Sequence, residues 1–434
     1  MSRGTKELTE ALAFLSSLGS SGIRLGLDRI ERALAAIGNP ERGYRIIHVA
    51  GTNGKGSTCA FAAACLMAQG HRVGLYTSPH LVRINERFQV NGDEISEQLL
   101  AERLLDVLER YPQARQDPPP LTFFELTTLL ALWHFAQERV DVAVLETGLG
   151  GRLDATTAAQ PTVTAITPIA LDHMDYLGNN LAAIAREKAG ILRPGVPAAI
   201  SRQEREAMDV VERIAAEQGV PLYIEKKDFE LRRGLSGALE YHGLRFDLDG
   251  LRLSLRGPHQ MQNAALALAS LELLAGQLPV DPSAMREGLV RTRWPGRLEE
   301  IGSRPPLLLD GAHNPLGVES LLTALSALYP RRRIHLVFGV LADKDYRAMI
   351  GRLFPHCSSV RLVAPPNPRA LEPSQYFVEA RALCWNTTAY RSVGAALGAA
   401  TASASPDDLV LCTGSLFLVG SVRERVLAPS VPAT

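Results

Sequence analysis

An apolar run at Tyr44–Ala50 leads through a glycine-rich turn into a helical stretch from about Ser57 to Gln69. Similar strand-like and helix-like runs alternate over most of the 434 residues. This alternation predicts an α/β protein with a mainly parallel sheet, because parallel strands are connected by helices. At about 150 residues per domain, the length fits two to three domains.

The pattern changes near residue 228. The runs Leu244–Leu248 and Leu251–Leu255 alternate with period two around Asp249-Gly250. A two-residue Asp-Gly loop between alternating runs is a strong signal for a β-hairpin. We therefore expect a small antiparallel appendage beside the parallel sheet, followed by a long Ala/Leu-rich helix at Pro258–Ala275.

The segment 292–306 is rich in Pro, Gly and Arg, and after it the strand–helix alternation restarts. It therefore predicts a domain boundary. We expect an N-terminal phosphate-loop (P-loop) domain over residues 1–296, with the mainly parallel sheet and its appendage. A C-terminal Rossmann-like α/β domain would cover residues 297–434.

The charge balance and the cysteines exclude several classes of protein. Lys and Arg number 46, as do Asp and Glu, so the formal net charge is zero. We expect no nucleic-acid or membrane partner, since such proteins usually carry a basic excess and no run approaches the ~20 apolar residues of a membrane span. The start of the chain is too acidic for a secretory signal, and five scattered cysteines suit a reducing compartment. We expect a cytoplasmic monomer.

The glycine-rich turn after the first strand has the context of a phosphate loop. The segment HVAGTNGKGST at 48–58 lies between a buried strand and a helix. Backbone N–H groups and the helix N-terminus can hold a polyphosphate there, and Lys55 adds a positive charge. The match to G-x-x-x-x-G-K-[ST] is imperfect, since Gly56 stands between Lys55 and Ser57. A tight turn with an exposed lysine is the alternative.

Acidic and imidazole side chains follow the next buried strands. Glu146 ends the apolar run at 140–145, and Asp172, His173 and Asp175 follow the strand at 161–167. In parallel sheets, ligands bind outside the carboxyl ends of the strands, and Mg²⁺ prefers oxygen ligands. These positions favour a metal or substrate role, although Glu146 alone could be a solvent-facing charge. From composition alone, Lys188 would be a surface lysine.

Eight motifs occur in an order that is specific. They resemble the folylpolyglutamate synthase and dihydrofolate synthase family, within the ATP-dependent Mur-type amide ligases, from about residue 24 to about residue 424. The motifs are HVAGTNGKGST, YTSPHL, LETGLGGRLDATT, ITPIALDHMDYLG, EKAGI, WPGRLE, LDGAHNP and TGSLFLVG. The resemblance implies that ATP phosphorylates a carboxylate and that the amine of L-glutamate attacks the acyl phosphate.

The resemblance also implies roles for individual residues. It assigns ATP phosphates to Gly54, Lys55, Gly56 and Ser57. Further ATP contacts would be Asn263, Arg297 and Asp310. Mg²⁺, at two sites, would be bound by Ser78, Glu146 and His173. Lys188 would be carbamylated, which turns a cation into an anionic oxygen ligand. His313 and Ser415 would face the acyl phosphate, where glutamate enters, and the expected catalytic residues are Lys55, Lys188 and His313.

Three further segments align with the family's site for the pterin-carrying substrate. In chain order, they are Gly26, Leu27, Asp28 and Arg29; Thr122, Phe123, Phe124 and Glu125; and Leu153, Asp154 and Ala155. An acid could pair with pterin N–H donors, and aromatic side chains could stack on the flat ring. The alternative is that the two phenylalanines are core residues and that Asp28 and Arg29 form a surface ion pair.

The resemblance leaves several functions open. The leading interpretation is an ATP-dependent ligase acting on dihydropteroate, on folyl-polyglutamates, or on both, as bacterial bifunctional enzymes do. One alternative is polyglutamate extension alone. Another is a Mur-type enzyme of cell-wall synthesis, although the phosphate loop starts only about fifty residues into the chain. A P-loop switch NTPase is less favoured, because the guanine-reading N-K-x-D motif is absent.

Overall fold

The computed structural model describes residues 5–20, 22, 24–116, 121–302 and 304–428. The chain divides into two compact units. The first unit comprises Met1–His80, Ile84–Ser254 and Gln262–Thr292, and the second comprises Leu81–Arg83, Leu255–Met261 and Arg293–Thr434. Among the described residues, no helix combines the length and the apolar character that crossing a membrane requires.

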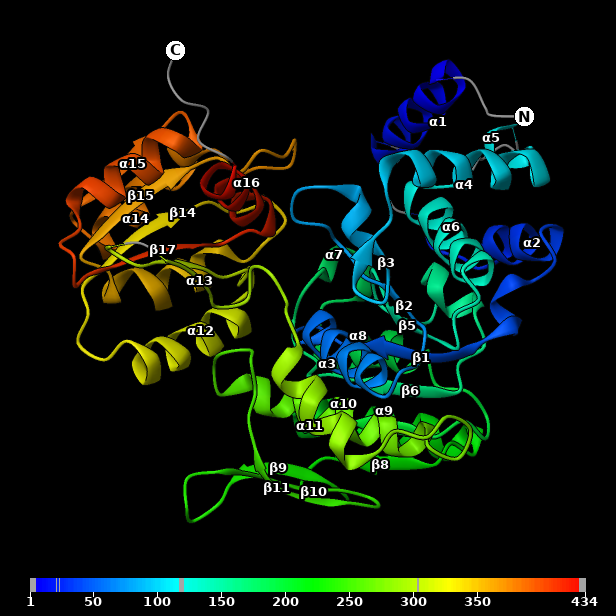
Figure 1. Ribbon diagram of the computed structural model, residues 1–434. Coiled ribbons are helices and arrows are strands. Elements are labelled where there is room, and N and C mark those ends of the chain that lie inside the picture. The colour runs from blue at the N-terminus through cyan, green and yellow to red at the C-terminus, as the bar shows by residue number, and fades with distance from the viewer. Residues whose placement is uncertain (1–4, 21, 23, 117–120, 303, 429–434) are drawn as a thin grey trace. The chain divides into compact units, whose positions relative to one another are not determined.

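An eight-stranded sheet forms the centre of the first unit (Figure 1). Its order is β4-β3-β2-β5-β1-β6-β7-β8. The pairs from β2 to β8 are parallel, and β3 and β4 add an antiparallel edge. The strands are β1 (Arg45–Ala50), β2 (Val73–Tyr76), β3 (Phe88–Val90), β4 (Asp93–Glu94), β5 (Val142–Glu146), β6 (Val163–Ile166), β7 (Ala198–Ile200) and β8 (Leu222–Ile224). The predicted α/β class with a mainly parallel sheet is confirmed.

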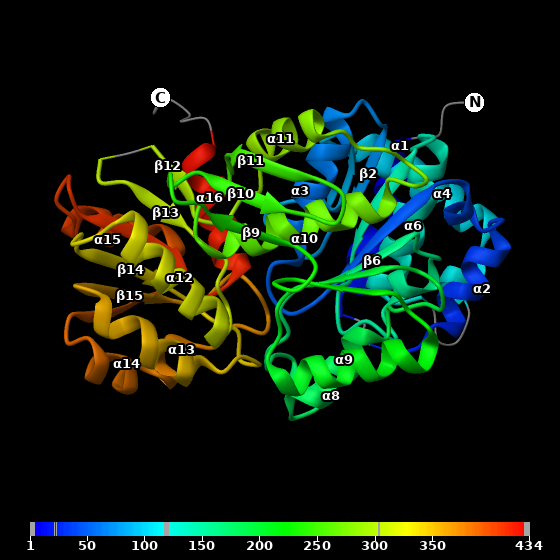
Figure 2. The ribbon, with the colours of Figure 1, turned by 90° about the horizontal axis from the view of Figure 1, so that it is seen from below.

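Helices connect and cover these strands. The α-helices of this unit are α1 (Thr5–Ser17), α2 (Asp28–Ala36), α3 (Lys55–Ala68), α4 (Glu97–Arg110), α5 (Gln113–Gln116), α6 (Phe123–Gln137), α7 (Met174–Leu177), α8 (Leu181–Ala189), α9 (Arg205–Gln218) and α11 (Pro282–Arg291), with α10 (His259–Leu274) beginning in the second unit. The 3₁₀ turns are η1 (Leu18–Ser20), η2 (Pro40–Gly43), η3 (Ile84–Arg87) and η4 (Ala155–Ala158). In both ribbon views α3 lies beside α11, which it contacts (Figures 1 and 2).

The start of α6 shows how the sequence determines a helix boundary. The Thr122 hydroxyl accepts a hydrogen bond from the Glu125 N–H, and the Glu125 carboxylate accepts one from the Thr122 N–H. This reciprocal capping box satisfies two backbone donors that the helix cannot pair internally. It therefore fixes the first turn of α6, and with it the positions of Phe123 and Phe124.

The small antiparallel appendage is present, but the predicted two-residue hairpin at Asp249-Gly250 is wrong. The three strands are β9 (Glu230–Arg233), β10 (Leu239–His242) and β11 (Asp247–Leu251), with β10 in the middle. The β10–β11 turn instead spans 243–246, where Gly243 N donates to Phe246 O at 3.0 Å. The pairing register shifts along β11, and Gly250 has φ +68°. A left-handed glycine serves a β-bulge as well as a turn, and here it forms a bulge.

The carboxylate of Glu272, on α10, holds this turn. It accepts hydrogen bonds from the backbone N–H groups of Leu244, Arg245 and Phe246 at 2.8–3.0 Å, and from the Tyr241 hydroxyl at 2.7 Å. Glu272 is buried. Four donors to a single carboxylate fasten the small sheet to α10.

The second unit has a six-stranded sheet of order β12-β13-β17-β14-β15-β16. Within the described part of this sheet, only the β12–β13 pair is antiparallel. The strands are β12 (Glu299–Ile301), β13 (Leu307–Leu309), β14 (Ile334–Phe338), β15 (Ser359–Val363), β16 (Thr387–Tyr390) and β17 (Leu409–Thr413). Its helices are α12 (Pro315–Leu328), α13 (Tyr346–Leu353), α14 (Phe377–Leu383), α15 (Val393–Ser403) and α16 (Leu416–Leu427), with 3₁₀ turns η5 (Phe354–His356) and η6 (Pro373–Gln375).

Alternate residues of these strands enter two different hydrophobic cores. Leu336 and Phe338 of β14 belong to one core, whereas Val337 belongs to the other. Successive side chains of a strand point to opposite faces, so a sheet covered on both faces needs a continuous apolar run. That requirement explains why β14 and β17 lack the polar alternation of a half-exposed strand.

Candidate functional site

The phosphate loop links β1 to α3. Gly51 has φ +144° and Gly54 has φ +90°, so both occupy conformations that favour glycine. A Cβ atom on Gly51 would collide with the side chain of Thr167, and one on Gly54 with that of Asn263. Gly54 is the N-cap of α3, so the helix starts at Lys55, two residues before the predicted start.

Lys55 closes the loop on itself. Its Nζ donates to the carbonyls of Gly51 and Thr52 at 3.2 Å each. Gly56 and Ser57 follow in the first turn of α3, where backbone N–H groups lack intrahelical acceptors and the helix dipole favours an anion. The first turn of α3 and the Lys55 ammonium group therefore present positive charge at one end of the loop.

Lys188 is a buried residue of α8, and its ammonium group reaches the same loop. Its Nζ donates to the Gly51 carbonyl at 2.6 Å. Burial and the nearby charge of Lys55 lower the pKa of Lys188 to about 7. The alternative of a surface lysine is therefore wrong: Lys188 is 5% exposed and its amine is partly neutral near pH 7.

The three predicted metal-binding residues follow three strands at the carboxyl edge of the sheet. Glu146 ends β5 and is buried, and its Oε2 accepts from the Ser78 N–H, after β2, at 3.1 Å. The interpretation of Glu146 as a solvent-facing charge is thus wrong. His173 follows β6 with φ +51°, and its N–H donates to Asp172 Oδ1 at 2.8 Å. Within the described part of the chain, no three His, Cys, Asp or Glu side chains form a group suited to a metal ion.

The segments predicted to bind the pterin-carrying substrate meet in space, because α2, α6 and η4 contact one another. Arg29 Nε donates to Glu125 Oε1 at 2.9 Å, while Glu125 Oε2 serves the capping box. The alternative of a surface ion pair between Asp28 and Arg29 is thus wrong, since Arg29 pairs with buried Glu125. Asp28 is exposed at the first turn of α2, after Leu27 as N-cap and Gly26 with φ +137°.

Asp154 organises the loop that follows β5. Its Oδ2 accepts from the N–H groups of Gly148 and Leu149 at 2.9 and 2.8 Å. Its Oδ1 accepts from the N–H and the hydroxyl of Thr156. Asp154 and Ala155 are buried and Leu153 is half-buried, so the Asp154 carboxylate is used by the protein itself.

The two phenylalanines at the start of α6 contact different partners. The guanidinium group of Arg87 lies 5.3 Å from the centroid of the Phe123 ring. Phe124 lies 6.1 Å from the Tyr76 ring, and a Cβ atom on Gly148 would lie 2.5 Å from its Cζ. Both residues are half-buried and pack against the hydrophobic core of this unit, so the core alternative holds in part.

A second group of predicted residues lies in the second unit, at the carboxyl ends of β13 and β17. Asp310 accepts from the N–H groups of Leu298 and Ala312 at 3.0 Å each. His313 Nδ1 lies 2.8 Å from the Gly311 carbonyl, and Ser415 caps α16. A Cβ atom on Gly311 would collide with the guanidinium group of Arg297. Gly414 N donates to Ala312 O, which joins the two strand ends.

Asn263, the remaining predicted ATP contact, lies in the first unit, beside Gly54.

Two pairs of polar side chains in the first unit, one half-buried and one buried, were missed by reasoning from the sequence. Arg87 Nε donates to His80 Nδ1 at 2.9 Å, and His48 Nε2 lies 2.8 Å from Thr156 Oγ1. Both histidines lie within the specific motifs, but their partners are separated from them by 7 and 108 positions. The closeness of His48 to the glycines of the phosphate loop was the one available signal.

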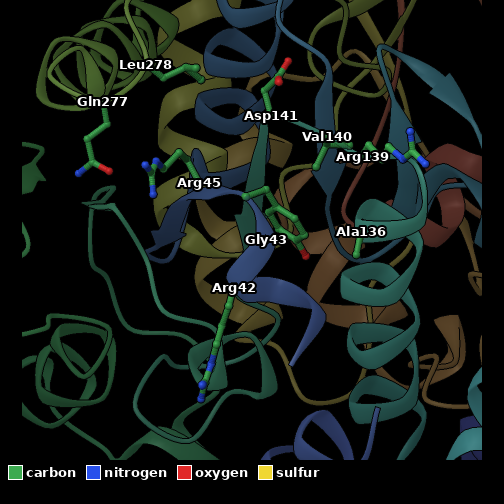
Figure 3. A pocket seen from close by; sticks show the side chains of 10 residues that line it. Arg42, Gly43, Arg45, Ala136, Arg139, Val140, Asp141, Gln277 and Leu278 are labelled. Carbon is green, nitrogen blue, oxygen red and sulfur yellow. The ribbon is translucent and has the colours of Figure 1, made fainter. Parts of the chain in front are cut away.

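An open pocket of about 550 Å³ lies at the opposite edge of the sheet (Figure 3). It includes Arg45 at the start of β1 and Asp141 just before β5. None of the predicted site residues lines it. The phosphate loop, Glu146 and Lys188 lie at the other edge of the sheet.

Comparison with known proteins gives two family matches. Residues 49–271 match the Mur ligase middle domain, and residues 296–416 match the Mur ligase glutamate ligase domain. Together these segments contain the phosphate loop and both groups of predicted residues, apart from Gly26–Arg29.

Individual proteins match over nearly the whole chain. Folylpolyglutamate synthase of Lacticaseibacillus casei is 38% identical, covering 96% of this chain and 98% of that protein. Dihydrofolate synthase/folylpolyglutamate synthase of Bacillus subtilis is 35% identical, covering 93% and 96%. The crystal structure of a bifunctional folylpolyglutamate synthase/dihydrofolate synthase from Yersinia pestis, complexed with AMPPNP and Mn ion, has a TM-score of 0.87 at 34% identity and covers 98% and 99%.

Proposed function

The chain belongs to the Mur ligases, in the group of the folylpolyglutamate and dihydrofolate synthases, and we propose on this premise that it joins L-glutamate to dihydropteroate, to a folyl-polyglutamate, or to both. It is an ATP-dependent acid–amino-acid ligase. The observation that carries the proposal is the meeting of a phosphate loop, a buried carboxylate and a buried lysine at one sheet edge. That edge provides what activating a carboxylate with ATP requires.

The reaction has two steps. A carboxylate oxygen of the substrate attacks the γ-phosphorus of ATP, which gives an acyl phosphate and ADP. The glutamate nitrogen then attacks the acyl carbon and loses a proton, and phosphate leaves with the electron pair of the C–O bond. The protein positions the reactants and stabilises the charge that develops on the phosphate oxygens.

The first unit binds the phosphates in this proposal. The N–H groups at the start of α3 and the Lys55 ammonium group hold them, through Gly54, Lys55, Gly56 and Ser57. When ATP binds, the Lys55 ammonium group would give up its two carbonyl partners and donate to oxygens of the transferred phosphate instead. Asn263 would contact the nucleotide, because it lies against Gly54.

The donors at the strand ends fit a divalent cation. They are a hydroxyl, a carboxylate and an imidazole, from Ser78, Glu146 and His173, and the Yersinia pestis relative holds Mn ion together with AMPPNP. Mg²⁺ bound there, at two sites, would offset the charge of the phosphates and the incoming carboxylate. The hydrogen bond from the Ser78 N–H holds the Glu146 carboxylate at the end of β5, which supports this assignment.

Lys188 would act as a carbamate. Its depressed pKa leaves a neutral amine near pH 7, which is the form that attacks CO₂. The product is an anionic oxygen donor beside the phosphate loop, and the change removes the repulsion between Lys188 and Lys55. The contact of its Nζ with Gly51 O supports this assignment by placing the nitrogen at the loop.

The second unit would supply glutamate binding and further ATP contacts, with residues 1–296 as the ATP-binding domain and 297–434 as the glutamate-ligase domain. Arg297 and Asp310 would contact ATP. His313 and Ser415 would face the acyl phosphate where glutamate enters. Their placement at the ends of neighbouring strands β13 and β17 supports one shared site within this unit.

Bifunctionality is part of the proposal, and the arrangement of the predicted pterin-binding segments supports it. The elements that carry the segments 26–29, 122–125 and 153–155 contact one another, and Phe123 and Phe124 are only half-buried. Dihydropteroate presents a benzoate carboxylate directly, whereas a folate places its carboxylate one glutamate further out. One pterin site could therefore serve both reactions.

A substrate panel tests the function. Phosphate release and incorporation of labelled glutamate are measured with ATP and Mg²⁺, using dihydropteroate or a folyl substrate. We expect both signals with both substrates, and none without glutamate. Extension of the folyl substrate alone would leave only the second activity. Phosphate release that ignores both pterin and glutamate would instead favour a switch NTPase, and use of a cell-wall precursor would favour a Mur-type enzyme.

The proposal includes the setting of the enzyme. We place it in the cytoplasm as a monomer, with ATP, L-glutamate and dihydropteroate or folates as its small-molecule partners. Neither nucleic acid nor membrane is part of the reaction. The zero net charge of the chain supports this view.

A further inference from the structure

Three side chains form a buried chain of hydrogen bonds inside the first unit. His48 Nε2 lies 2.8 Å from Thr156 Oγ1, and Thr156 Oγ1 lies 2.5 Å from Asp154 Oδ1. All three residues are at most 4% exposed. His48 is in β1, three positions before Gly51 of the phosphate loop, whereas Asp154 and Thr156 belong to the loop after β5. These hydrogen bonds thus connect the strand before the phosphate loop with the segment predicted to bind the pterin-carrying substrate.

The direction of these hydrogen bonds follows from the donor inventory. The Asp154 carboxylate accepts at both oxygens, so the single hydrogen of the Thr156 hydroxyl goes to Asp154. The Thr156 oxygen is then free only to accept, and His48 must donate its Nε2–H. Burial and the charge of Arg193 lower the pKa of His48 to about 3, so this donor is a neutral imidazole.

Asp154 in turn holds the backbone of the loop after β5. Its second oxygen binds the N–H groups of Gly148 and Leu149, and Gly148 lies against the Phe124 ring. The residues on either side of Asp154 are Leu153 and Ala155, which complete the segment assigned to the pterin-carrying substrate. A shift of the Asp154 carboxylate would therefore move the Leu153–Ala155 segment and the support of Phe124 together.

We propose that His48 and Thr156 are positioning residues for the pterin-carrying substrate, acting through Asp154. They touch neither substrate nor ATP in this scheme. The inference rests on the proposed function, because it takes residues 153–155 as part of the pterin site. The new element is that the Nε2–H group of His48, in β1, fixes the geometry of this site through its hydrogen bond to Thr156.

The matched variants are Thr156→Val, Thr156→Ser and Thr164→Val. Valine at 156 keeps the shape but removes both hydrogen bonds of the hydroxyl, whereas serine keeps them. Thr164 is an equally buried threonine that pairs with His48 across β1 and β6, and its hydroxyl has no hydrogen-bond partner among the described residues. It therefore controls for the loss of a buried hydroxyl near His48.

Dihydropteroate affinity is measured by pterin fluorescence, and KM and kcat by glutamate incorporation. We expect Thr156→Val to raise the Kd and KM for dihydropteroate about ten-fold, as the loss of one to two buried hydrogen bonds implies. The KM for ATP should stay within about two-fold, and Thr156→Ser and Thr164→Val should resemble the parent. The inference would be overturned if Thr156→Val raised the KM values for ATP and dihydropteroate equally, or left the KM for dihydropteroate unchanged.

A double-mutant cycle with His48→Phe and Thr156→Val tests the chain itself. If His48 acts through Thr156, the two substitutions together should raise the pterin KM no more than Thr156→Val alone. Additive effects would refute the coupling. If the parent protein binds no pterin, the proposed function fails. If the parent binds pterin and the variants bind it equally well, only this inference fails.

Discussion

The phosphate loop and the pterin segments lie in the same unit but use their polar groups in different ways. The loop is one continuous stretch, and the N–H groups that begin α3 point out of the helix end. The pterin segments come from three distant parts of the chain, and their buried acids are already paired. Glu125 binds Arg29 and Thr122, and Asp154 binds its own loop.

This difference separates two kinds of site. The phosphate loop offers charge and helix-end donors, so its residue types reveal what it binds. Buried ion pairs and hydrogen bonds instead hold the three predicted pterin-binding segments in place. A buried acidic residue in the second kind of site therefore supports the structure, and its substitution should lower stability before it affects the chemistry.

Removal of Lys55 should have the largest effect. Lys55→Ala should lower kcat about a thousand-fold, because in the proposed mechanism it removes the positive charge that stabilises the transferred phosphate. Stability should change little, since Lys55 is half-buried and its ammonium group donates to two loop carbonyls. Phosphate release and thermal unfolding check both points, with exposed Lys227→Ala as control. Normal turnover of Lys55→Ala at saturating ATP would remove the loop from the mechanism.

Lys188→Ala should have the second-largest effect. Its kcat should be about a hundred-fold lower, and short carboxylic acids should partly restore the activity. Because the pKa of Lys188 is lowered to about 7, its neutral fraction rises as the pH increases through 7. At constant dissolved CO₂, activation of CO₂-depleted enzyme should therefore increase from about pH 6 to about pH 8. A ¹³C NMR signal from labelled bicarbonate should appear in the parent and be absent in Lys188→Ala. Full activity without that signal would contradict the carbamate.

Glu125→Ala should mainly cost stability. It leaves Arg29 without its buried partner and removes half of the capping box, so unfolding free energy should fall by about 3 kcal/mol. Glu125→Gln should lose less, because glutamine can keep the capping box. Urea unfolding measures both, with exposed Glu217→Ala as control. Unchanged stability with lost pterin binding would show that Glu125 faces the ligand.

Gly148→Ala should have the smallest effect. Its Cβ would lie 2.5 Å from Phe124 Cζ, so the ring must shift. We expect a pterin KM a few-fold higher, an unchanged KM for ATP, and about 1 kcal/mol less stability from the overpacking. Gly351→Ala, in α13, has open space around it and should keep the parent KM values. An unchanged pterin KM would mean that Phe124 does not contact the substrate.

Local patterns predicted local structure well. Strand β1, the glycine loop and α3 are consecutive, so their order alone determined the loop. The error at Asp249-Gly250 arose because a left-handed glycine suits a bulge and a turn equally. Only the pairing of β11 with β10 distinguishes them, and pairing depends on the tertiary structure.

Long-range partners were beyond such patterns. Arg29 and Glu125 are 96 positions apart, so nothing nearby in the sequence indicated their pairing. Lys188 looked like a surface lysine because its helix also carries Arg186 and Glu187. Its burial depends on how α8 packs against the phosphate loop, and the resemblance to a known family was the only guide to its role.

The Glu272 carboxylate couples the local stability of the small sheet to that of α10. The β10–β11 turn can open only if four donors leave that carboxylate together. The amide hydrogens of Leu244, Arg245 and Phe246, although they lie in a turn, should then exchange with deuterium as slowly as those of α10. The small sheet and the helix would form one cooperative unit, in which a single side chain couples the opening of both.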